Sequence, residues 1–468
     1  GPRVTSKVRF LWIRPQPKDE LEWIGYLSLG DSVAVRGGTA EAADAGPGPG
    51  GRCTRWYAVE PRGYVCVGHD ATLDDEDADV VELQKGGAKA EPWPYDYGES
   101  LGTTIYVAIP PKRRQYFRES AYNEHMEAVG RAREAKSDEE VAAIDPRLVG
   151  VDLQPTGNPP PKLLLHLGGR AMPRGSAGKY GFPEVVRGST IASSYDFDAD
   201  GRSWLLTWDR GIVPKDRVRP FPRASFHGVA LGDGIDLPLA FFRQAQPKLR
   251  RGPDGVGESG ASWPRYGWVG LTGEELDIGG QRYLVTREDG LLCRAADLSL
   301  PERREEQPER VRDEGGEGSW IDISIPGGWL VAYEGKTAVY ATMISPGRGG
   351  LPVAGKTLLE TASTPVGDFA LGGKFHTATM VSNASDKVVH AEVPYTQNFS
   401  GPYALHSAYW HDDWGVPKSG GCVNLAPIDA MRLFAWTRPR LPAGWHGWRA
   451  AAGDQPPDGP PTVVSLHR

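Results

Sequence analysis

A cysteine, a histidine and a run of small residues near the C-terminal end have the types and spacing of a nucleophilic site. Cys422 follows Ser419, Gly420 and Gly421, and His406 lies sixteen positions before the cysteine. A thiolate is a strong nucleophile, and a neighbouring imidazole can lower the pKa of a thiol and take up its proton. Glycines leave room for backbone N–H groups to converge on one point, as an oxyanion site requires. The spacing predicts a thiol that attacks a carbonyl, with Cys422 as nucleophile and His406 as base.

Such a pair alone has a plainer interpretation, because a lone cysteine after glycines is more often a small buried residue in a turn. The surrounding residues favour chemistry. The stretch Leu405-His406-Ser407, followed by Ser419-Gly420-Gly421-Cys422-Val423-Asn424, resembles the motif of the L,D-transpeptidase (YkuD-like) catalytic domain of bacterial cell-wall enzymes. The segment Thr364-Pro365-Val366-Gly367-Asp368-Phe369 resembles a turn of the same family. The resemblance covers about residues 316–450.

The resemblance implies an acyl transfer without a cofactor. The Cys422 thiolate would attack the carbonyl before the terminal D-Ala of a peptidoglycan tetrapeptide stem, release D-Ala and form a thioester. An amine of a second stem would then give a 3→3 cross-link. His406 would act as base and then as acid, the Ser407 carbonyl would orient the imidazole, and the backbone N–H groups of Gly421 and Cys422 would bind the oxyanion. Carbapenems would be expected to acylate Cys422.

One residue departs from the family pattern, since Gly420 stands where the family usually has a histidine. The family's base is the earlier histidine, which His406 matches, so the change should affect local shape or substrate contact more than proton transfer. The departure leaves two alternatives to the transpeptidase. One is a wall-binding scaffold with a degenerate catalytic domain, and the other is a thiol L,D-carboxypeptidase or endopeptidase.

The residues expected to contact the substrate are Tyr403, Ser419, Gly420, Asn424 and Asp413. Asp413 lies in the loop 409–415 between base and nucleophile, where a carboxylate would suit a cationic acceptor amine; a solvated acid is the alternative. For Tyr403 the alternative is packing. His411 and Asp412 precede Asp413, but three consecutive residues of an extended loop do not easily converge on one ion, so we expect no metal.

The elements that must position these residues are short strands and one helix. Residues 319–325 alternate apolar and polar side chains, and residues 329–333 follow a Pro-Gly-Gly turn as a hairpin partner. Residues 337–345 are a third apolar run. Residues 427–436 predict a helix with proline in its first turn, placed to support the cysteine loop from behind.

A repeat precedes this domain. An aromatic residue is followed seven positions later by glycine and two apolar residues, at Trp56/Gly63, Trp204/Gly211 and Tyr283/Gly290. Each copy predicts strand, tight turn, strand. The pattern resembles bacterial SH3-like modules, and three unrelated hairpins are the alternative. We therefore predict a mainly β protein: SH3-like small β-barrel modules, then a β-sandwich L,D-transpeptidase catalytic domain with a few short helices.

The 468 residues exceed what one core normally fills, so several domains are expected. Residues 114–136 predict a helical insertion, and a capping-box pattern at Ser137 predicts a second short helix. The predicted organisation begins with an SH3-like module (1–72), followed by an acidic linker with the helical insertion (73–165). A second SH3-like module (166–250) and a third (251–300) follow, and these two could form one unit. A charged linker (301–318) then leads to the catalytic domain (319–468).

Charge and composition exclude some partners. The net charge is −7 with both signs interspersed, so nucleic acid is not expected as a partner. No apolar run approaches the ~18 residues of a membrane span, so we expect no transmembrane segment in this chain. Cys53 and Cys66 flank a predicted hairpin, where a disulfide and two unpaired thiols are both open. The family resemblance implies peptidoglycan stem peptides as partners and a periplasmic or cell-envelope location; the oligomeric state does not follow from the sequence.

Overall fold

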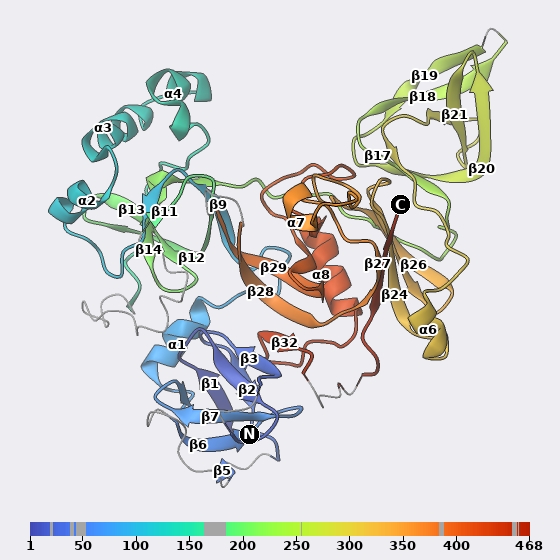
Figure 1. Ribbon diagram of the computed structural model, residues 1–468. Coiled ribbons are helices and arrows are strands. Elements are labelled where there is room, and N and C mark those ends of the chain that lie inside the picture. Colours follow the sequence, from blue (N-terminus) through green and yellow to red (C-terminus); the bar gives the residue numbers. More distant parts are fainter. Residues whose placement is uncertain are drawn as a thin grey trace. The chain divides into compact units, whose positions relative to one another are not determined.

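The computed structural model describes residues 1–18, 22–37, 42–43, 53–162, 184–253, 255–382, 388–451, 456 and 458–468 (Figure 1). The chain divides into two compact units. The first contains residues 1–223, 375–394 and 441–454, and the second contains residues 224–374, 395–440 and 455–468. Short strands outnumber helices in both units, which confirms the predicted mainly β fold with a few short helices. No helix in the described ranges is long and apolar enough to cross a membrane.

The first unit begins with a sheet of short strands. Its strands are β1 (Arg3–Ser6), β2 (Leu11–Arg14), β3 (Gly25–Leu27), β4 (Ser32–Ala34), β5 (Ala42–Ala43), β6 (Cys53–Ala58), β7 (Tyr64–Gly68), β8 (Ala71–Thr72) and β32 (Gly447–Arg449). Val4, Ile13, Val33 and Val65 are fully buried in its core. Burial of such apolar side chains is the main source of stability in a small β-sheet domain.

A five-stranded antiparallel sheet and the helical insertion complete the first unit. The sheet contains β9 (Asp96–Ser100), β12 (Thr190–Ala199), β13 (Arg202–Thr207), β14 (Ile212–Pro214) and β15 (Val218–Pro220), and β10 (Thr103–Thr104) pairs with β11 (Glu184–Val185). The helices are α1 (Ala78–Lys85), α2 (Lys112–Arg118), α3 (Tyr122–Ala132) and α4 (Asp138–Ile144), with 3₁₀ turns η2 (Pro146–Leu148) and η3 (Lys215–Arg217). Figure 1 shows α2, α3 and α4 in teal.

The helical insertion differs from the single helix predicted over residues 114–136. The helix is broken at Glu119–Ala121, where Ala121 has a φ of +48°. The break turns Glu119 inward, where its carboxylate contacts Arg202 and Arg217. The predicted cap at Ser137 is confirmed, since its side chain accepts the N–H of Glu140 at 3.3 Å.

The two segments predicted as linkers contain ordered elements. In the acidic run of residues 74–79, Asp77 caps α1 and pairs with Lys7 at 2.6 Å. Residues 301–318 contain α6 (Glu309–Asp313), and Val311 of this helix is buried. Charged composition favoured linkers, but capping and one buried apolar side chain suffice to fold these segments onto the neighbouring strands.

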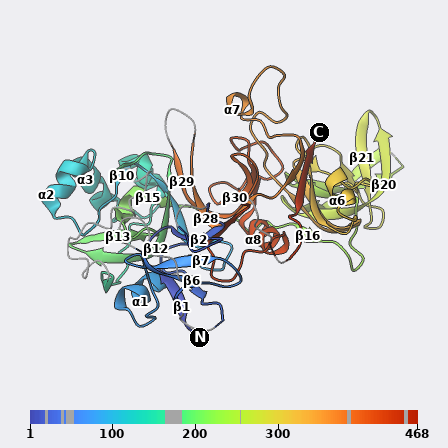
Figure 2. The same cartoon turned by 60° about the horizontal axis from the view of Figure 1, so that its bottom comes forward.

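The central sheet of the second unit has the strand order β16-β26-β25-β24-β33-β27. Its strands are β16 (Val229–Ala230), β24 (Ser319–Ser324), β25 (Trp329–Glu334), β26 (Thr337–Met343), β27 (Gly367–Ala370) and β33 (Val463–His467). The predicted hairpin is confirmed, with Ser324 opposite Trp329 and Gly328 at a φ of +63° in the turn. The C-terminal strand β33 runs parallel to β24. It is the dark red ribbon that leads to the C-terminus in Figures 1 and 2.

A second layer of this unit carries the predicted nucleophile and base. The strands β28 (Gly373–Val381) and β29 (Val389–Ser400) contribute residues to both units. The C-terminal part of β29 pairs with β30 (Tyr403–Ser407), which runs parallel to β31 (Val423–Leu425). The helix α8 (Pro427–Trp436) has the bounds that the sequence predicts and packs against β30. A short helix, α7 (Leu358–Thr361), lies on the loop after β26.

The remaining sheet of the second unit is formed by one continuous segment, which we term the β17–β23 module (yellow-green in Figure 1). It contains β17 (Leu239–Phe242), β18 (Gln246–Gly252), β19 (Gly255–Trp263), β20 (Trp268–Ile278), β21 (Gln281–Thr286), β22 (Leu292–Arg294) and β23 (Leu298–Ser299). Its core includes Phe242, Trp263, Leu284 and the thiol of Cys293. Burial raises the pKa of Cys293 to about 12, which makes it an inert structural thiol.

The three predicted hairpins all form, as β6–β7, β13–β14 and β21–β22. Gly63 and Gly290 have positive φ angles, as tight turns require. In the second copy the left-handed residue is Arg210, with a φ of +67°, rather than Gly211. The assignment of these segments to SH3-like modules, with the boundaries given above, stays a prediction.

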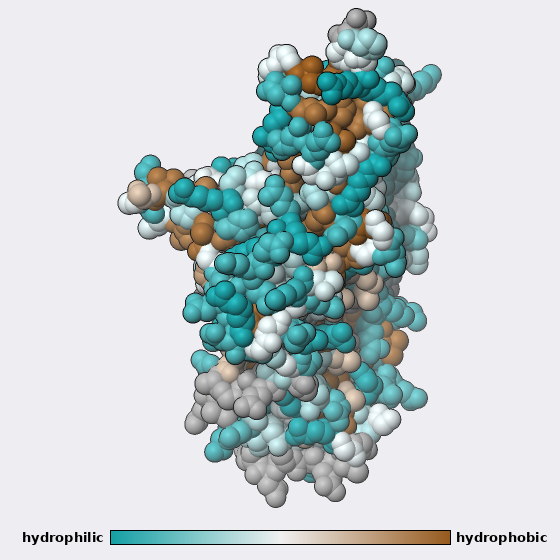
Figure 3. Space-filling view, turned by 90° about the vertical axis from the view of Figure 1, so that its right-hand side faces the viewer, coloured by the Kyte–Doolittle hydropathy of each residue, from teal (hydrophilic) through white to brown (hydrophobic). Residues whose placement is uncertain are grey.

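Hydrophilic residues dominate the face of the molecule in Figure 3, and hydrophobic residues occur there in smaller groups. Charged side chains interspersed with small apolar groups are usual for a protein surface.

Candidate active site

The parallel pair β30–β31 brings the strand of the predicted base next to the segment of the predicted nucleophile. His406 lies directly opposite Asn424. Cys422 is two residues before Asn424 and directly precedes β31. Its thiol contacts the backbone at the start of β30, through the Pro402 carbonyl and the N–H of Ala404. The local pairing thus brings together two segments whose key residues are sixteen positions apart in sequence.

The hydrogen bond of His406 determines which ring nitrogen is basic. Nδ1 lies 2.9 Å from the backbone carbonyl oxygen of Ser407. A carbonyl only accepts hydrogen bonds, so Nδ1 carries the proton in the neutral ring and Nε2 keeps its lone pair. His406 is buried. The geometry therefore offers Nε2 as a proton acceptor.

The environment of the Cys422 thiol differs from the sequence expectation. The residue is half-buried, its S–H donates to the Pro402 carbonyl with an S···O distance of 3.8 Å, and its sulfur accepts the backbone N–H of Ala404. Desolvation raises the pKa of Cys422 to about 11, and the N–H of Ala404 only partly opposes this rise. The expected lowering of the pKa by an imidazole is therefore contradicted, because desolvation of the anion has the larger effect. At neutral pH the thiol of the free protein is protonated.

The loop before the nucleophile is closed by one side chain. Oγ of Ser419 accepts the N–H of Gly421 at 3.0 Å and donates to the carbonyl of Cys422 at 2.5 Å. These bonds form a local serine turn that fixes the backbone next to the nucleophile. The hydroxyl of Ser419 thus stabilises the loop, and the predicted contact of Ser419 with substrate stays a prediction. Because the N–H of Gly421 is also used in this turn, the N–H of Cys422 is the better candidate oxyanion donor.

The two glycines of this loop meet different surroundings. Gly421 has a φ of +128°, and a Cβ at this position would lie 2.6 Å from the Tyr403 ring and 2.8 Å from the Ser363 carbonyl oxygen. A Cβ at Gly420 would have nothing within 4 Å among the described residues, and Gly420 is exposed. Gly421 is therefore required by the backbone, whereas a histidine would fit at position 420. Tyr403 is buried against Gly421, as in the packing alternative, and its contact with substrate stays a prediction.

His411 and Asn424 form a buried contact that the sequence did not indicate. Nδ1 of His411 accepts the N–H of Asp413 at 3.2 Å, and its Nε2 lies 3.0 Å from the side-chain amide of Asn424. Burial lowers the pKa of His411 to about 4, so the ring is neutral and its proton is on Nε2. The Asn424 amide must then present its oxygen to Nε2, an orientation that also pairs an oxygen otherwise without a partner among the described residues. Asn424 is 1% exposed, so it supports the site from within.

Asp413 is paired with two cations of the protein. Its carboxylate lies 2.6 Å from Nζ of Lys418 and 3.4 Å from the Arg265 guanidinium. The hydrogen bond from Lys418 is the main cause of the lowered pKa of Asp413. The predicted contact with an acceptor amine stays a prediction, and such an amine would have to compete with both cations.

A buried carboxylate fixes the helix behind the cysteine loop. Asp429, in the first turn of α8, is fully buried and accepts hydrogen bonds from Tyr340 at 2.6 Å, Thr342 at 2.5 Å and the N–H of Gly228 at 2.9 Å. Burial raises the pKa of Asp429, and these three donors oppose the rise. Asp429 is not among the residues predicted for the site, although an acid in the first turn of an otherwise apolar helix is an available signal.

Comparison with known proteins agrees with this description of the last third of the chain. Residues 318–448 match the family model described as the L,D-transpeptidase catalytic domain, YkuD. The recognised motif of Cys422 and His406 lies within this range, so the family expectation for this part of the chain is confirmed. No protein of curated function matches the chain.

Several solved L,D-transpeptidases are similar to part of the chain. One from Xylanimonas cellulosilytica is 22% identical with a TM-score of 0.22, and the match covers 36% of this chain and 64% of that one. A mutant enzyme from Enterococcus faecium is 18% identical with a TM-score of 0.24, covering 32% and 50%. One from Stackebrandtia nassauensis is 22% identical with a TM-score of 0.21, covering 32% and 56%. The chain thus spans less than two-thirds of the length of these structures.

Proposed function

We propose that the domain of residues 318–448 is a peptidoglycan L,D-transpeptidase that uses Cys422 as nucleophile. The observation that supports this most directly is the pairing of β30 with β31, in which His406 lies opposite Asn424, two residues after Cys422, within the range that matches the L,D-transpeptidase family model. The hydrogen bond from His406 to the Ser407 carbonyl leaves Nε2 as the basic nitrogen. Cysteine acyl transfer requires such a base with a defined tautomer to reach the thiol.

In the first half-reaction the thiol loses its proton as it attacks. Nε2 of His406 accepts the proton of Cys422 while the sulfur bonds to the carbonyl carbon before the terminal D-Ala of a tetrapeptide stem. The backbone N–H of Cys422 donates to the oxyanion, and one such donor is typically worth about 3 kcal/mol. The C–N bond then breaks, the imidazolium gives its proton to the leaving D-Ala amine, and a thioester remains.

In the second half-reaction an amine of another stem attacks the thioester. His406 takes a proton from the amine, the C–S bond breaks and Cys422 leaves as a thiol. The product is a 3→3 cross-link; with water in place of the amine, the product is a trimmed stem. The pKa of about 11 for Cys422 favours this concerted use of the base over a thiolate formed in advance.

The proposed location is the periplasm or outer cell envelope, where peptidoglycan stems are found. Cys66 is disulfide-bonded. Structural disulfides persist in oxidising compartments and are rare in a reducing cytosol. The sequence left open a disulfide of Cys66 with Cys53, and the side chain of Cys53 lies outside the described residues.

The proposal is tested by intact-protein mass spectrometry after incubation with a tetrapeptide muropeptide. We expect an adduct on Cys422 equal to the muropeptide minus D-Ala, together with free D-Ala. The variant Cys422→Ala should lose both, whereas Cys293→Ser, which changes the buried free thiol of the β17–β23 module, should retain both.

The products separate the alternatives. A cross-linked dimer supports transpeptidation, and a trimmed monomer alone assigns a carboxypeptidase. If neither adduct nor D-Ala release is seen, the catalytic proposal is wrong and the scaffold interpretation replaces it. The exposed and unobstructed position of Gly420 would then be the first place to restore activity, by Gly420→His.

A further inference from the structure

The loop between base and nucleophile is held on one side by the catalytic sheet. The N–H of Gly415 donates to the Ile344 carbonyl at 3.0 Å, and Oγ of Ser345 donates to the Asp413 carbonyl at 2.5 Å. Ile344 and Ser345 directly follow β26, and the backbone of Ser345 also exchanges hydrogen bonds with Asn424. This side of the loop is therefore tied to the strand that follows Cys422.

The other side of the loop is held by the β17–β23 module. The Tyr266 hydroxyl donates to the Asp412 carbonyl and accepts the N–H of Trp414 at 3.4 Å. The Arg265 guanidinium donates to the same carbonyl at 3.0 Å and pairs with the Asp413 carboxylate. Arg265 and Tyr266 occupy the turn between β19 and β20, and Tyr266 has a φ of +65°. A non-glycine residue in this strained conformation indicates that the turn is fixed by its contacts.

A second contact from the module fixes the end of the loop. Arg243, just after β17, donates to the Gly415 carbonyl at 3.2 Å. Gly415 has a φ of +84°, and a Cβ there would lie 2.8 Å from both the Arg243 side chain and Oγ of Ser299. Module and loop thus approach so closely that only glycine fits at this position.

Contacts within the loop connect it to the strands that carry the reactive residues. Asp413, held by Arg265, donates its N–H to His411, and His411 contacts the amide of Asn424. Asn424 lies opposite His406 and two residues after Cys422. The His411 ring also packs against Trp414 with a centroid distance of 4.8 Å. A continuous series of polar contacts therefore connects the turn of the module to the strand that carries the nucleophile.

We propose that Arg265 and Tyr266 are positioning residues for the Cys422–His406 pair, and that the β17–β23 module serves to hold the loop 411–415 in its reactive conformation. They would act through His411 and Asn424, without touching substrate. Ordering a loop in advance removes an entropic cost from the reaction, and small displacements of reacting groups reduce rates strongly. This inference rests on the proposed function of the site, but it concerns how the site is kept in shape.

The test measures the reactivity of Cys422 directly, so that it does not depend on any peptide substrate. In a Cys293→Ser background, the alkylation rate of Cys422 by iodoacetamide is followed by mass spectrometry for Tyr266→Phe and Arg265→Ala. Matched controls are Tyr283→Phe and Arg282→Ala, which alter residues of β21 in the same module. Each variant of the first pair loses two contacts with the loop. A net loss equivalent to about one hydrogen bond should change the alkylation rate about three- to tenfold in the first pair, and less than twofold in the controls.

A double-mutant comparison of Tyr266 and His411 distinguishes a positioning role of Tyr266 from a general loss of stability. His411→Phe keeps an aromatic ring beside Trp414 but removes both ring nitrogens. If Tyr266 acts through His411, the double variant Tyr266→Phe/His411→Phe changes the alkylation rate no more than His411→Phe alone, at a melting temperature equal to that of the single variant. Arg265→Lys should recover part of the rate, because it retains the charge that pairs with Asp413.

Two results would overturn the inference: multiplicative effects of Tyr266→Phe and His411→Phe, or unchanged alkylation in both Tyr266→Phe and Arg265→Ala. Neither result tests the proposed transpeptidation, which is measured independently through the release of D-Ala. Conversely, a protein that shows the coupling but releases no D-Ala retains the positioning device and lacks the proposed activity.

Discussion

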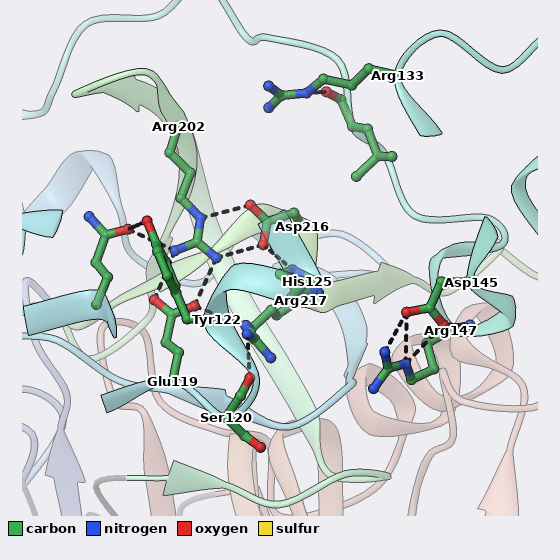
Figure 4. A network of polar contacts seen from close by, with 12 residues as sticks. Glu119, Ser120, Tyr122, His125, Arg133, Asp145, Arg147, Arg202, Asp216 and Arg217 are labelled. Atoms are coloured by element: carbon green, nitrogen blue, oxygen red, sulfur yellow. Dashed lines mark hydrogen bonds and ion pairs between the residues drawn. The ribbon is translucent and has the colours of Figure 1, made fainter. Parts of the chain in front are cut away.

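Two polar regions of this protein differ in how burial affects their ionisable groups: a carboxylate stays charged in the first, and a thiol stays neutral in the second. In the first unit, Arg202 lies between Glu119 and Asp216, with guanidinium–carboxylate distances of 2.7 to 2.9 Å (Figure 4). Arg217 and His125 complete the group, contacting Glu119 at 2.9 Å and Asp216 at 2.8 Å. In the second unit, the hydrogen bonds of the Cys422 thiol within the described residues are to neutral backbone groups, the Pro402 carbonyl and the Ala404 N–H.

The difference follows from the number of opposite charges available. Burial disfavours the charged form of Asp216, but hydrogen bonds from Arg202 and His125 hold its pKa well below the usual range. The thiol of Cys422 receives one backbone N–H, so burial dominates and its pKa rises. Burial with charged partners produces a fixed structural network, whereas burial without them produces a group whose charge forms only during a reaction.

Removal of Arg202 should have the largest effect, because it leaves two carboxylates buried without their main partner. We expect Arg202→Met to lower the free energy of unfolding by about 3–5 kcal/mol. Urea denaturation followed by tryptophan fluorescence gives this value. The control Arg223→Met removes a solvent-exposed pair with Asp96 and should cost less than about 1 kcal/mol. Equal effects of both variants would show that the Arg202 group is no more than a surface network.

Lys374 is a buried cation that has no carboxylate at hydrogen-bond distance among the residues that the structure describes. Its ammonium donates to the carbonyls of Phe434 at 2.6 Å and Thr437 at 2.9 Å, at the C-terminal end of α8. Desolvation lowers the pKa of Lys374 to about 7, with Asp458 opposing the change. The unfolded pKa is about 10.4, so between pH 7 and 10 the unfolded chain binds more protons and stability rises with pH.

The expected slope is at most about 1.4 kcal/mol per pH unit, and we expect a gain of about 2 kcal/mol between pH 7 and 9. The free energy of unfolding, measured at these pH values, should lose this dependence in Lys374→Met. A wild-type protein with constant or falling stability over this range would show that the two carbonyls fully compensate the buried charge.

The smallest expected effect concerns the two glycines of the cysteine loop. Gly421→Ala forces an alanine into a positive φ and against the Tyr403 ring, so D-Ala release should fall at least about tenfold. Gly420→Ala meets open space and should change the rate by less than about twofold, since exposed substitutions are usually near neutral. Similar losses in both variants would indicate that Gly420, too, is needed in the loop.

Those parts of the fold that depend on local sequence were predictable. The hairpin at residues 319–333 and the helix α8 follow from alternation and from proline in a first turn, and the structure has both. The Cys422 motif likewise depends on adjacent residues. The break at Glu119 was not predictable, because the helix ends where a distant arginine attracts the carboxylate. Tertiary contacts override local helix preference in such cases.

The supporting residues of the site were missed for the same reason. His411 and Asn424 are thirteen residues apart and meet only because the loop folds back. Tyr266 comes from a segment far from the motif, and no spacing rule connects it to Cys422. Asp429 lies close to the motif in sequence, but its partners Tyr340 and Thr342 come from the distant strand β26. The pKa of the nucleophile was predicted in the wrong direction, since sequence indicates a neighbouring imidazole but not the extent of desolvation.

We propose that Cys422 is a neutral thiol that loses its proton only as it reacts. The rate of iodoacetamide alkylation of Cys422 in Cys293→Ser protein across pH 6 to 10 tests this protonation state. With a pKa of about 11, the rate should rise close to tenfold per pH unit throughout and reach no plateau. A plateau above pH 7, which would indicate a thiolate already paired with the His406 imidazolium, would contradict it.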